Sequence, residues 1–476
     1  MEMKRVVEEA REAFESRITR SYFWRSSQLR ALRDLLVEKE AEICDVLRKD
    51  LGKHYVEAYR DEVGFLIKSV DYALGNLKKW MTPRKVDLPF VCFPSTGAVV
   101  PEPLGTVLIF SSWNFPIGLS LEPLIGALSA GNALVLKTSE FAPASSSFLA
   151  NNIPKYLDNK AVKIVEGGPV TGEQLLEYKW DKIFFTGSSR VGRLVMAAAA
   201  KHLTPVCLEL GGKCPAIIDK LKSSRDMMIT VNRVAGAKWG LCSGQACISI
   251  DYILVDEKFA PVLIDSLKSR ISMSYSDTKN VARIAQMQHF ERLRSFLKEP
   301  EVAASIVHGG SLDAKSLSIE PTILLNPPLD SQIMKEEIFG PLLPIITLKN
   351  LEDSIGFIKA MPKPLVIYAF TKNESFKKRI VEETTSGGVV FNDAMVQFAC
   401  DTLPFGGIGE SGFGKYHGKF SFDLFTHGKA VLRRSFLIEF GFRYPPWNEN
   451  KLQLIRYLIR FNYFGLALML LGLKKS

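Results

Sequence analysis

The stretch KIFFTGSSRVGRLVMAAAA (residues 182–200) decides the fold class of this chain. Its first six residues are an apolar run of strand length, and residues 190–200 continue with helical spacing. A strand that enters a helix through small residues forms a βα unit, whose free N–H groups at the helix start suit a phosphate. The stretch therefore predicts a parallel sheet and a nucleotide site, although a Gly-Ser turn also occurs in βα units that bind no nucleotide.

Further apolar runs lie on both sides of this unit and alternate with helical spacing. Before it they are TVLIF (106–110), ALVLK (133–137) and AVKIVEG (161–167). After it they are CPAIID (214–219), DYILVD (251–256) and GPLLPIITL (340–348). Alternating strands and helices are typical of parallel α/β sheets. We expect an α/β protein with two lobes, preceded by about 80 mainly helical residues.

Length and composition exclude several classes of protein. The 476 residues are too many for one minimal domain, and 47% hydrophobic with 24% charged side chains excludes a natively unfolded or collagen-like chain. The formal net charge is +10, but residues 429–476 carry nine basic and two acidic side chains, which leaves only +3 for residues 1–428. The charge therefore favours an anionic membrane surface for the tail, and no nucleic acid partner is expected.

The two ends of the chain bear on its location. MEMKRVVEEAREAFE (1–15) is acidic and amphipathic, which predicts a cytosolic protein without a secretion signal or transit peptide. In the apolar tail, Arg456 and Arg460 leave an uninterrupted run of 13 residues (461–473), against the roughly 20 that a spanning helix needs. We expect an interfacial or docking helix, and leave open whether it contacts a membrane or is packed or disordered in solution.

Several patterns fail as functional motifs. Residues 407–412 read G-x-G-x-x-G but follow no buried strand, and residues 409–415 read G-x-x-x-x-G-K but continue with Tyr416 instead of Ser or Thr. A glycine-rich turn explains both patterns better.

The six histidines have no metal-ligand spacing, so no metal site is expected. The seven cysteines show no framework spacing and predict reduced thiols.

Two side chains have the chemistry of a nucleophile and a general base. Cys247 lies in the glycine-containing loop SGQACIS (243–249), which could expose a thiol and aim N–H groups at an oxyanion. Cys242 is its rival, and most cysteines are simply small core residues. Glu209 lies inside an apolar strand, where burial would raise its pKa into the range of a general base; an outward-facing strand residue is the alternative.

Seven motifs follow one another in order between residues 112 and 407. They are Ser112-Trp113-Asn114-Phe115-Pro116, Lys137-Thr138-Ser139-Glu140, Phe185-Thr186-Gly187-Ser188, Leu208-Glu209-Leu210-Gly211-Gly212-Lys213, Gly244-Gln245-Ala246-Cys247, Glu337-Ile338-Phe339-Gly340-Pro341 and Pro404-Phe405-Gly406-Gly407. Together they resemble the aldehyde dehydrogenase superfamily. The short N-terminus, the wording LELGGKCP and the hydrophobic C-terminal extension are most similar to its class 3 branch for fatty or aromatic aldehydes, and to plant members of that branch.

The resemblance implies a role for each matching residue. Cys247 would be the nucleophile, Glu209 the general base and Asn114 the amide donor to the oxyanion, and Cys242 falls outside the motif. The cofactor NAD, with NADP as the alternative, would be held by Lys137 and Glu140 at the adenosine ribose, by Gly187, Ser188 and Gly192 under the pyrophosphate, and by Glu337 and Phe339 at the nicotinamide.

The resemblance also implies an architecture and a location. It implies two Rossmann-type parallel-sheet lobes plus a small oligomerisation segment. The expected parts are an NAD-binding domain (1–82 and 101–208), a catalytic domain carrying the cysteine (209–390), bridging or oligomerisation segments (83–100 and 391–444) and a basic hydrophobic tail (445–476). The expected form is a homodimer in the cytoplasm, with the endoplasmic reticulum or another membrane surface as the place that the tail would contact.

The implied reaction is NAD(P)-dependent oxidation of an aldehyde to a carboxylic acid. The substrate would be a medium- or long-chain aliphatic or an aromatic aldehyde of lipid origin, and the intermediates a thiohemiacetal and a thioester on Cys247, hydrolysed with Glu209 as base. Three alternatives stay open. They are an acylating dehydrogenase that passes the thioester to coenzyme A, a catalytically idle scaffold on the same fold, and a cysteine hydrolase without nicotinamide.

Overall fold

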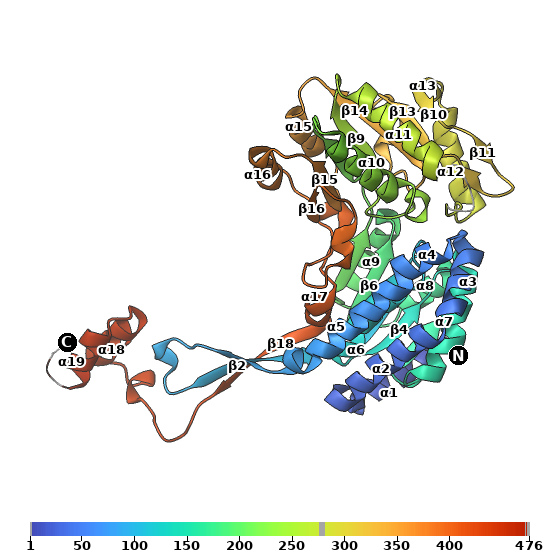
Figure 1. Cartoon of the computed structure of the whole chain (residues 1–476). Helices are drawn as coiled ribbons and strands as arrows, with labels where there is room; N and C mark the ends of the chain where they lie inside the picture. The colour runs from blue at the N-terminus through green and yellow to red at the C-terminus, as the bar shows by residue number, and fades with distance from the viewer. Residues whose placement is uncertain (1, 276–280, 472, 474–476) are drawn as a thin grey trace. The chain divides into compact units, whose positions relative to one another are not determined.

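The computed structural model describes residues 2–275, 281–471 and 473 of the chain (Figure 1). The chain divides into two compact units, a large unit (Met1–Leu77 with Pro103–Phe425) and a small unit (Lys78–Glu102 with Thr426–Ser476). The finer division into NAD-binding, catalytic and bridging parts stays a prediction. Residues 391–425 belong to the large unit, because the elements that they contain pair with its strands or pack on its helices.

The first sheet of the large unit has the strand order β17-β7-β6-β3-β4-β5. Its strands are β3 (Thr106–Phe110), β4 (Ala133–Lys137), β5 (Val162–Val165), β6 (Lys182–Gly187), β7 (Val206–Leu210) and β17 (Gly412–Phe413). The pairs from β5 to β7 are parallel, and β17 is antiparallel to β7. Every residue of β3 and β4 is buried, as in a parallel sheet that is covered on both faces. The predicted strands of this region are confirmed.

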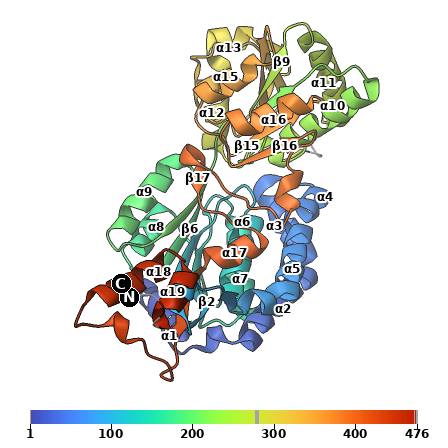
Figure 2. The ribbon, with the colours of Figure 1, turned by 90° about the vertical axis from the view of Figure 1, so that its left-hand side faces the viewer.

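Helices from distant parts of the sequence surround this sheet (Figure 2). They are α1 (Glu2–Glu15), η1 (Ile18–Arg20), α2 (Tyr22–Glu38), α3 (Glu40–Leu51), α4 (Tyr55–Ala58), the π-helical turn η2 (Tyr59–Val63), α5 (Gly64–Met81), α6 (Gly118–Ala130), α7 (Pro143–Tyr156), α8 (Pro169–Leu176), α9 (Ser189–Ala200) and α17 (Gly418–Leu424). The helical start of the chain is confirmed.

The second sheet forms the other lobe of the large unit, with the order β10-β13-β14-β9-β8-β15-β16. Its strands are β8 (Pro215–Ile218), β9 (Tyr252–Asp256), β10 (Ile306–His308), β13 (Thr322–Leu325), β14 (Leu342–Leu348), β15 (Val366–Phe370) and β16 (Gly388–Phe391), beside a ribbon of β11 (Leu312–Asp313) and β12 (Ser318–Ile319). The pairs from β13 to β16 are parallel, and β10 is antiparallel to β13. The strands predicted in this region are confirmed as well.

The helices of this lobe lie between its strands in the sequence. They are α10 (Ser224–Lys238), η4 (Cys242–Gly244), α11 (Ala260–Ser274), α12 (Met287–Lys298), α13 (Pro300–Ala304), α14 (Gln332–Lys335), α15 (Asp353–Ala360) and α16 (Glu374–Glu383). The short helices η6 (Val396–Ala399) and η7 (Gly409–Ser411) follow the last strand of the lobe, and η7 contacts β7 of the first sheet. The core of the lobe includes Phe290, Phe376 and Leu254, which are almost completely buried. The two sheets give the expected α/β fold with two lobes.

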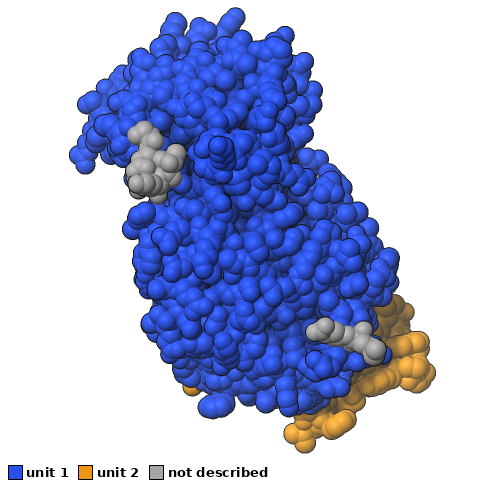
Figure 3. Space-filling model, turned by 90° about the vertical axis from the view of Figure 1, so that its right-hand side faces the viewer, with its two compact units in different colours: residues 1–77, 103–425 blue, residues 78–102, 426–476 orange. Residues whose placement is uncertain are grey.

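The small unit, orange in Figure 3, combines a sheet with the C-terminal helices. Its elements are β1 (Arg84–Val86), η3 (Phe90–Cys92), β2 (Thr96–Pro103), β18 (Thr426–Arg433), η8 (Gly441–Arg443), α18 (Glu449–Ile459) and α19 (Tyr463–Leu470), with the sheet order β1-β2-β18. Tyr457, Leu458 and Leu466 pack α18 and α19 against each other. Within the described ranges, no helix is both long and apolar enough to cross a membrane.

Candidate active site

Cys247 lies in the loop that leads from η4 into β9. This loop begins with three consecutive residues of positive φ, Cys242 (46°), Ser243 (53°) and Gly244 (78°), a strained path that persists only where the surroundings fix it. The Gln245 side chain fixes it by donating hydrogen bonds to the carbonyls of Cys242 and Arg283, both at 2.9 Å. Cys242 is completely buried, whereas Cys247 is half-buried. The two thiols therefore differ in access.

Asn114 follows the end of β3 and is held on the same loop. Its Nδ2 donates to the Gln245 carbonyl at 2.9 Å, two residues before Cys247, and the residue is only 2% exposed. An amide nitrogen carries two N–H groups, so one remains for an oxygen atom bound at the thiol. The structure thus brings Asn114 and Cys247 together from different sheets.

Glu209 lies in β7 and is buried, as its apolar neighbours in the sequence suggested. Its Oε2 has no hydrogen-bond partner among the described residues, and its Oε1 lies 3.8 Å from the Cys207 Sγ. A buried carboxylate oxygen without a partner is costly, and such groups concentrate at functional sites. The alternative of an outward-facing strand residue does not fit this burial.

The glycine-rich stretch at 407–415, which matches nucleotide-binding patterns only in its letters, pairs with the strand that contains Glu209. In the register of β17 on β7, Gly412 lies opposite Glu209. A Cβ atom at Gly412 would overlap the Leu208 carbonyl oxygen, and one at Gly406 would lie 3.2 Å from the Glu209 Oε1. The glycines thus allow a close backbone approach beside the carboxylate, which explains them without a nucleotide.

The electrostatics of the site couple the thiol to carboxyl groups. Burial raises the pKa of the Cys247 thiol, and the negative charges of Glu337 and Glu209 raise it further. The backbone N–H groups of Cys247 and Ile248 act in the opposite direction. Burial also raises the pKa of Glu209 well above the usual carboxyl range. A thiol and a basic carboxylate therefore share one low-dielectric site.

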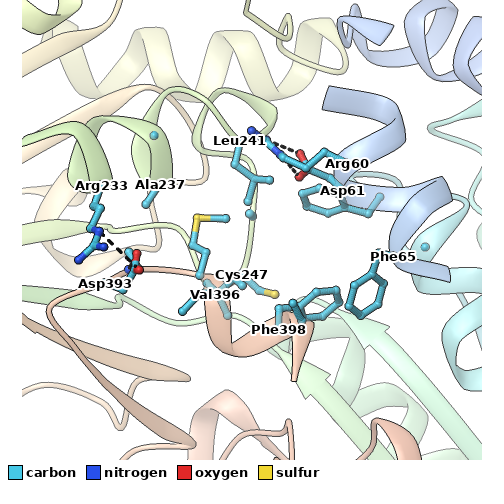
Figure 4. Close-up of a pocket in the computed structure, with 18 of the residues that line it drawn as sticks. Arg60, Asp61, Phe65, Arg233, Ala237, Leu241, Cys247, Asp393, Val396 and Phe398 are labelled. Atoms are coloured by element: carbon cyan, nitrogen blue, oxygen red, sulfur yellow. Dashed lines mark hydrogen bonds and ion pairs between the residues drawn. The ribbon is translucent and has the colours of Figure 1, made fainter. Parts of the chain in front are cut away.

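Cys247 lines a cavity of about 410 Å³ with mostly apolar walls. Phe65, Phe115 and Phe398 supply aromatic surface. Two ion pairs lie on opposite sides of the cavity in Figure 4, Arg60–Asp61 at 2.5 Å and Arg233–Asp393 at 3.5 Å. Each arginine of the wall is thus neutralised by an aspartate, and the cavity suits an uncharged apolar molecule.

The predicted nucleotide residues meet at the carboxyl edge of the first sheet. Lys137 ends β4, and its Nζ is 2.7 Å from the Glu140 Oε2. Gly187 ends β6, and the Ser188 side chain caps α9 by accepting a hydrogen bond from the Val191 N–H at 3.4 Å. Both strands neighbour β3, so these turns lie beside each other at the edge where α/β sheets bind ligands.

Gly192 sets the packing of α9 under this turn. A Cβ atom at Gly192 would lie 3.0 Å from the Leu210 Cδ2 on β7, tighter than ordinary van der Waals contact. The glycine therefore lets the helix start approach the sheet. In a phosphate-binding βα turn, the last glycine of the motif has this role of letting the helix pack closely on the sheet.

Glu337 and Phe339 lie on a loop of the second lobe. A Cβ atom at Gly211 would overlap the Glu337 Oε2, so the double glycine after β7 makes room for this carboxylate. Burial is the main reason that the pKa of Glu337 is raised to about 8. The Gly212 N–H lowers this pKa, and the charge of Asp251 raises it. Phe339 has a positive φ of 54°, and its ring meets the edge of Trp113 at 5.4 Å between centroids.

A comparison with protein families identifies the arrangement. A family model described as "Aldehyde dehydrogenase family" matches residues 1–431. The chain belongs to this family. It is accordingly an oxidoreductase that acts on aldehydes and uses NAD(P).

Similar proteins and structures agree with this family. Aldehyde dehydrogenase family 3 member F1 from Arabidopsis thaliana is 54% identical and matches over 99% of both chains. A substrate-bound structure of Staphylococcus aureus AldH has a TM-score of 0.92 at 37% identity, covering 96% of this chain and 99% of that one. Glyceraldehyde-3-phosphate dehydrogenase GapN from Methanocaldococcus jannaschii, solved with NADP, has a TM-score of 0.82 at 27% identity, with 91% and 94% covered. The resemblance to class 3 enzymes of plants and the α/β fold are both confirmed.

The residues present fit a dinucleotide. Helix α9 begins directly after a turn of small residues, so the N–H groups of Ser189 and Arg190, which precede the capped Val191 N–H, can face a phosphate. Lys137 and Glu140 offer a cation and a carboxylate at the neighbouring strand end, and Glu337 offers a second carboxylate across the site. These groups could donate to phosphates and accept from ribose hydroxyls.

Two groups of buried ionic residues position the site, and sequence reasoning missed both. The Lys213 Nζ forms an ion pair with Asp251 and donates to the carbonyls of Ile333 (2.8 Å) and Glu336 (2.9 Å), while Asp251 accepts from the Ile338 N–H at 2.9 Å. Lys213 and Asp251 thus hold the loop that carries Glu337. The available signal was an isolated lysine directly after the double glycine, in an otherwise apolar stretch.

The second group lies behind Asn114. Lys53 and Glu62, both fully buried, form an ion pair of 2.6 Å, and the Lys53 Nζ donates to the Asn114 carbonyl at 2.9 Å. Glu62 also accepts from the N–H groups of Ile117 and Gly118, each at 2.9 Å. The π-helical turn η2 supplies Glu62 to this network and Arg60 and Asp61 to the cavity wall.

Proposed function

We propose that this aldehyde dehydrogenase oxidises uncharged medium- or long-chain aliphatic and aromatic aldehydes, such as those derived from lipids, to carboxylic acids. Cys247 is the nucleophile, Asn114 the oxyanion donor and Glu209 the general base. The observation that carries the proposal is the half-buried Cys247 thiol in an apolar cavity, with the Asn114 amide on its loop and the unpartnered Oε2 of Glu209 in the same low-dielectric site.

The first step is attack of the Cys247 thiolate, which forms once the thiol has lost its proton, on the aldehyde carbon. A C–S bond forms, and the electron pair of the carbonyl π bond moves to oxygen. The second N–H of the Asn114 amide and the Cys247 backbone N–H stabilise this oxyanion, which is worth several kcal/mol in a water-poor site. NAD or NADP, when bound, supplies the hydride acceptor for the oxidation. A thioester then remains on Cys247.

Hydrolysis of the thioester needs an activated water molecule. The Glu209 Oε2 has no protein partner among the described residues and can accept a proton from water. A pKa raised by burial makes this carboxylate a stronger base near neutral pH. As the C–O bond forms, the C–S bond breaks, the carboxylic acid leaves and the sulfur is regenerated.

Lys137 and Glu140 would hold the adenosine ribose, and Gly187, Ser188 and Gly192 would lie under the pyrophosphate. A carboxylate at the ribose repels a 2′-phosphate, which favours NAD over NADP. Glu337 and Phe339 would hold the nicotinamide end. The positive φ of Phe339 and the raised pKa of the Glu337 carboxyl support a positioning role for this loop.

The cavity supports the substrate class. Its aromatic walls favour apolar chains and rings, and both wall arginines already have carboxylate partners. An anionic aldehyde would have to compete with these aspartates. Uncharged aldehydes avoid that cost.

We assign the dinucleotide to residues 1–82 and 101–208 and the catalytic cysteine to the lobe of residues 209–390. The small unit would form a homodimer through β18, an edge strand of its sheet with mostly exposed side chains. The tail supports contact with a membrane, since exposed Phe461 and Phe464 lie near Arg456 and Arg460. The protein would then act in the cytoplasm or at the endoplasmic reticulum or another membrane surface.

The test follows reduced nicotinamide and free acid after mixing the protein with NAD and a medium-chain aldehyde, without coenzyme A. The wild type should turn over steadily to acid. Glu209→Gln should keep a rapid burst of reduced nicotinamide and lose steady turnover by at least about 10²-fold, because only hydrolysis lacks its base. Glu122→Gln removes another buried carboxyl whose pKa burial raises, to about 7, but it lies in α6 and should keep turnover.

Other outcomes would support the alternatives. A wild-type burst that resumes only with coenzyme A would identify an acylating enzyme. Ester cleavage without any reduced nicotinamide would identify a hydrolase, and inactivity with several aldehydes and either cofactor would favour an idle scaffold.

A further inference from the structure

The small unit contains a cavity of its own, with a volume of about 520 Å³. Aromatic and aliphatic side chains form most of its wall, among them Phe90, Phe93, Phe440 and Leu466. They come from η3 and the residue after it, from the segment after β18 and from α19. The volume lies within the roughly 300–1,000 Å³ of pockets that bind small molecules.

Arg434 brings two unpartnered N–H donors into this apolar wall. Its Nε and Nη2 atoms are buried and have no hydrogen-bond acceptor among the described residues. Its guanidinium carbon lies 5.8 Å from the centre of the Phe440 ring. Arg443, the other arginine of the wall, differs because its Nη1 is 3.0 Å from the Glu439 Oε1.

Buried N–H donors without an acceptor are unfavourable, and arginine cannot relieve the cost by losing its proton. Nε and Nη2 belong to one edge of the guanidinium, whose parallel N–H groups match the two oxygens of a single carboxylate. The observed pair of open donors therefore indicates a missing anion of that shape, surrounded by apolar surface.

We propose that this cavity binds a free amphiphilic carboxylic acid. The carboxylate pairs with the Nε and Nη2 of Arg434, and the alkyl or aryl chain lies along the aromatic wall. This goes beyond the proposed function and does not depend on it, because binding needs neither the cofactor nor Cys247. The ligand has the chemical class of an aldehyde dehydrogenase product.

The test is equilibrium dialysis of the full-length protein with dodecanoate below its micelle concentration, without cofactor or aldehyde. Arg434→Gln should lose one equivalent of binding per chain or weaken it at least 10-fold. Arg433→Gln is the matched control, since it removes the same charge from the adjacent, exposed position and should bind like the wild type. Dodecanol should bind equally to all three proteins. Equal losses in both variants, or no loss in either, would overturn the proposal.

A second measurement uses the wild type alone and does not rely on a variant that folds. A dodecanoate carrying a photoreactive diazirine should label peptides that contain residues 90–93 or 440–442, and excess dodecanoate should suppress this labelling. Labelling confined to the Cys247 cavity would refute the proposal. So would retention on phosphatidylserine vesicles without binding of monomeric dodecanoate, which would assign Arg434 to a membrane surface.

Discussion

The stability of the large unit is expected to depend on the buried ion pair of Lys53 and Glu62 staying intact. Glu62 accepts three hydrogen bonds, from Lys53 and from the backbone of Ile117 and Gly118. Burial alone would lower the pKa of Lys53, but Glu62 and other nearby acidic groups raise it overall, so the ammonium stays charged. Glu62→Gln keeps the volume and removes the compensating charge.

The expected cost follows from this geometry. Removing one partner of a fully buried ion pair typically destabilises a protein by about 3–5 kcal/mol, because the other charge stays buried. With an unfolding entropy of about 2.1 cal/mol/K per residue, the roughly 400 residues of the large unit lose about 1.2 °C of thermal midpoint for each kcal/mol. Glu62→Gln should therefore lower the midpoint by roughly 4–6 °C.

Differential scanning fluorimetry and calorimetry at pH 7.5 would measure this change. Asp71→Asn is the matched control, since its ion pair with Arg33 is equally short at 2.7 Å but about half exposed, and its shift should stay below about 2 °C. Lys53→Met added to Glu62→Gln should recover part of the loss by removing the uncompensated ammonium. A shift of Glu62→Gln no larger than that of Asp71→Asn, or no recovery in the double variant, would refute the reasoning.

Three further predictions concern the chemistry, the selectivity and the pH response. Cys247→Ala should abolish the burst of reduced nicotinamide and lower turnover by at least about 10³-fold, whereas Cys242→Ala should stay within about 10-fold of the wild type, because only Cys247 lines the cavity. Asp393→Asn leaves the Arg233 charge without its carboxylate, although the guanidinium still donates to the Asn392 carbonyl. The variant should raise kcat/KM for an ω-carboxylated aldehyde over an uncharged one of equal length by about 2- to 5-fold, the effect of one half-exposed charge pair, and an unchanged ratio would remove the ion pair from selectivity. Burial, with a smaller effect of Lys68, lowers the pKa of His417 to about 3. Only the unfolded chain then binds a proton on this ring as the pH falls below about 6.5, and this group should cost about 1.4 kcal/mol of stability per pH unit. His417→Phe should therefore reduce the drop in thermal midpoint between pH 7.5 and pH 5.0, and an unchanged drop would contradict the assignment.

The strands of this protein could be read from its sequence because their signal is local. The runs at 106–110, 133–137 and 182–187 are apolar at every or nearly every position, and strands of those bounds are buried on both faces. A parallel sheet covered by helices produces such runs wherever its strands lie. The βα turn at Gly187 and Ser188 was equally readable, since a helix start needs small and capping residues at fixed positions.

The boundary between the two units and the role of the glycine-rich stretch at 407–415 depended on contacts between distant segments. Residues 412–413 pair with β7, about 200 residues earlier, and so bring the chain back to the first sheet after the second one is complete. Local composition cannot encode which strand a short glycine-rich segment will join, because pairing partners are chosen by the whole sheet. The motif could be rejected from its context, but its contact with the Glu209 strand could not be foreseen.

The sequence by itself determined the fold class, the family and the residue types of the site, because these reside in local patterns and ordered motifs. Only the tertiary structure decided that Glu209 is buried with an open oxygen, that Cys242 is closed off while Cys247 is accessible, and that Lys53, Glu62, Lys213 and Asp251 position the loops. The physical reason is that burial and ionic pairing are properties of the packed chain. A side chain acquires its pKa, its access and its partners from residues far away in sequence, and these meet only after the sheets have formed.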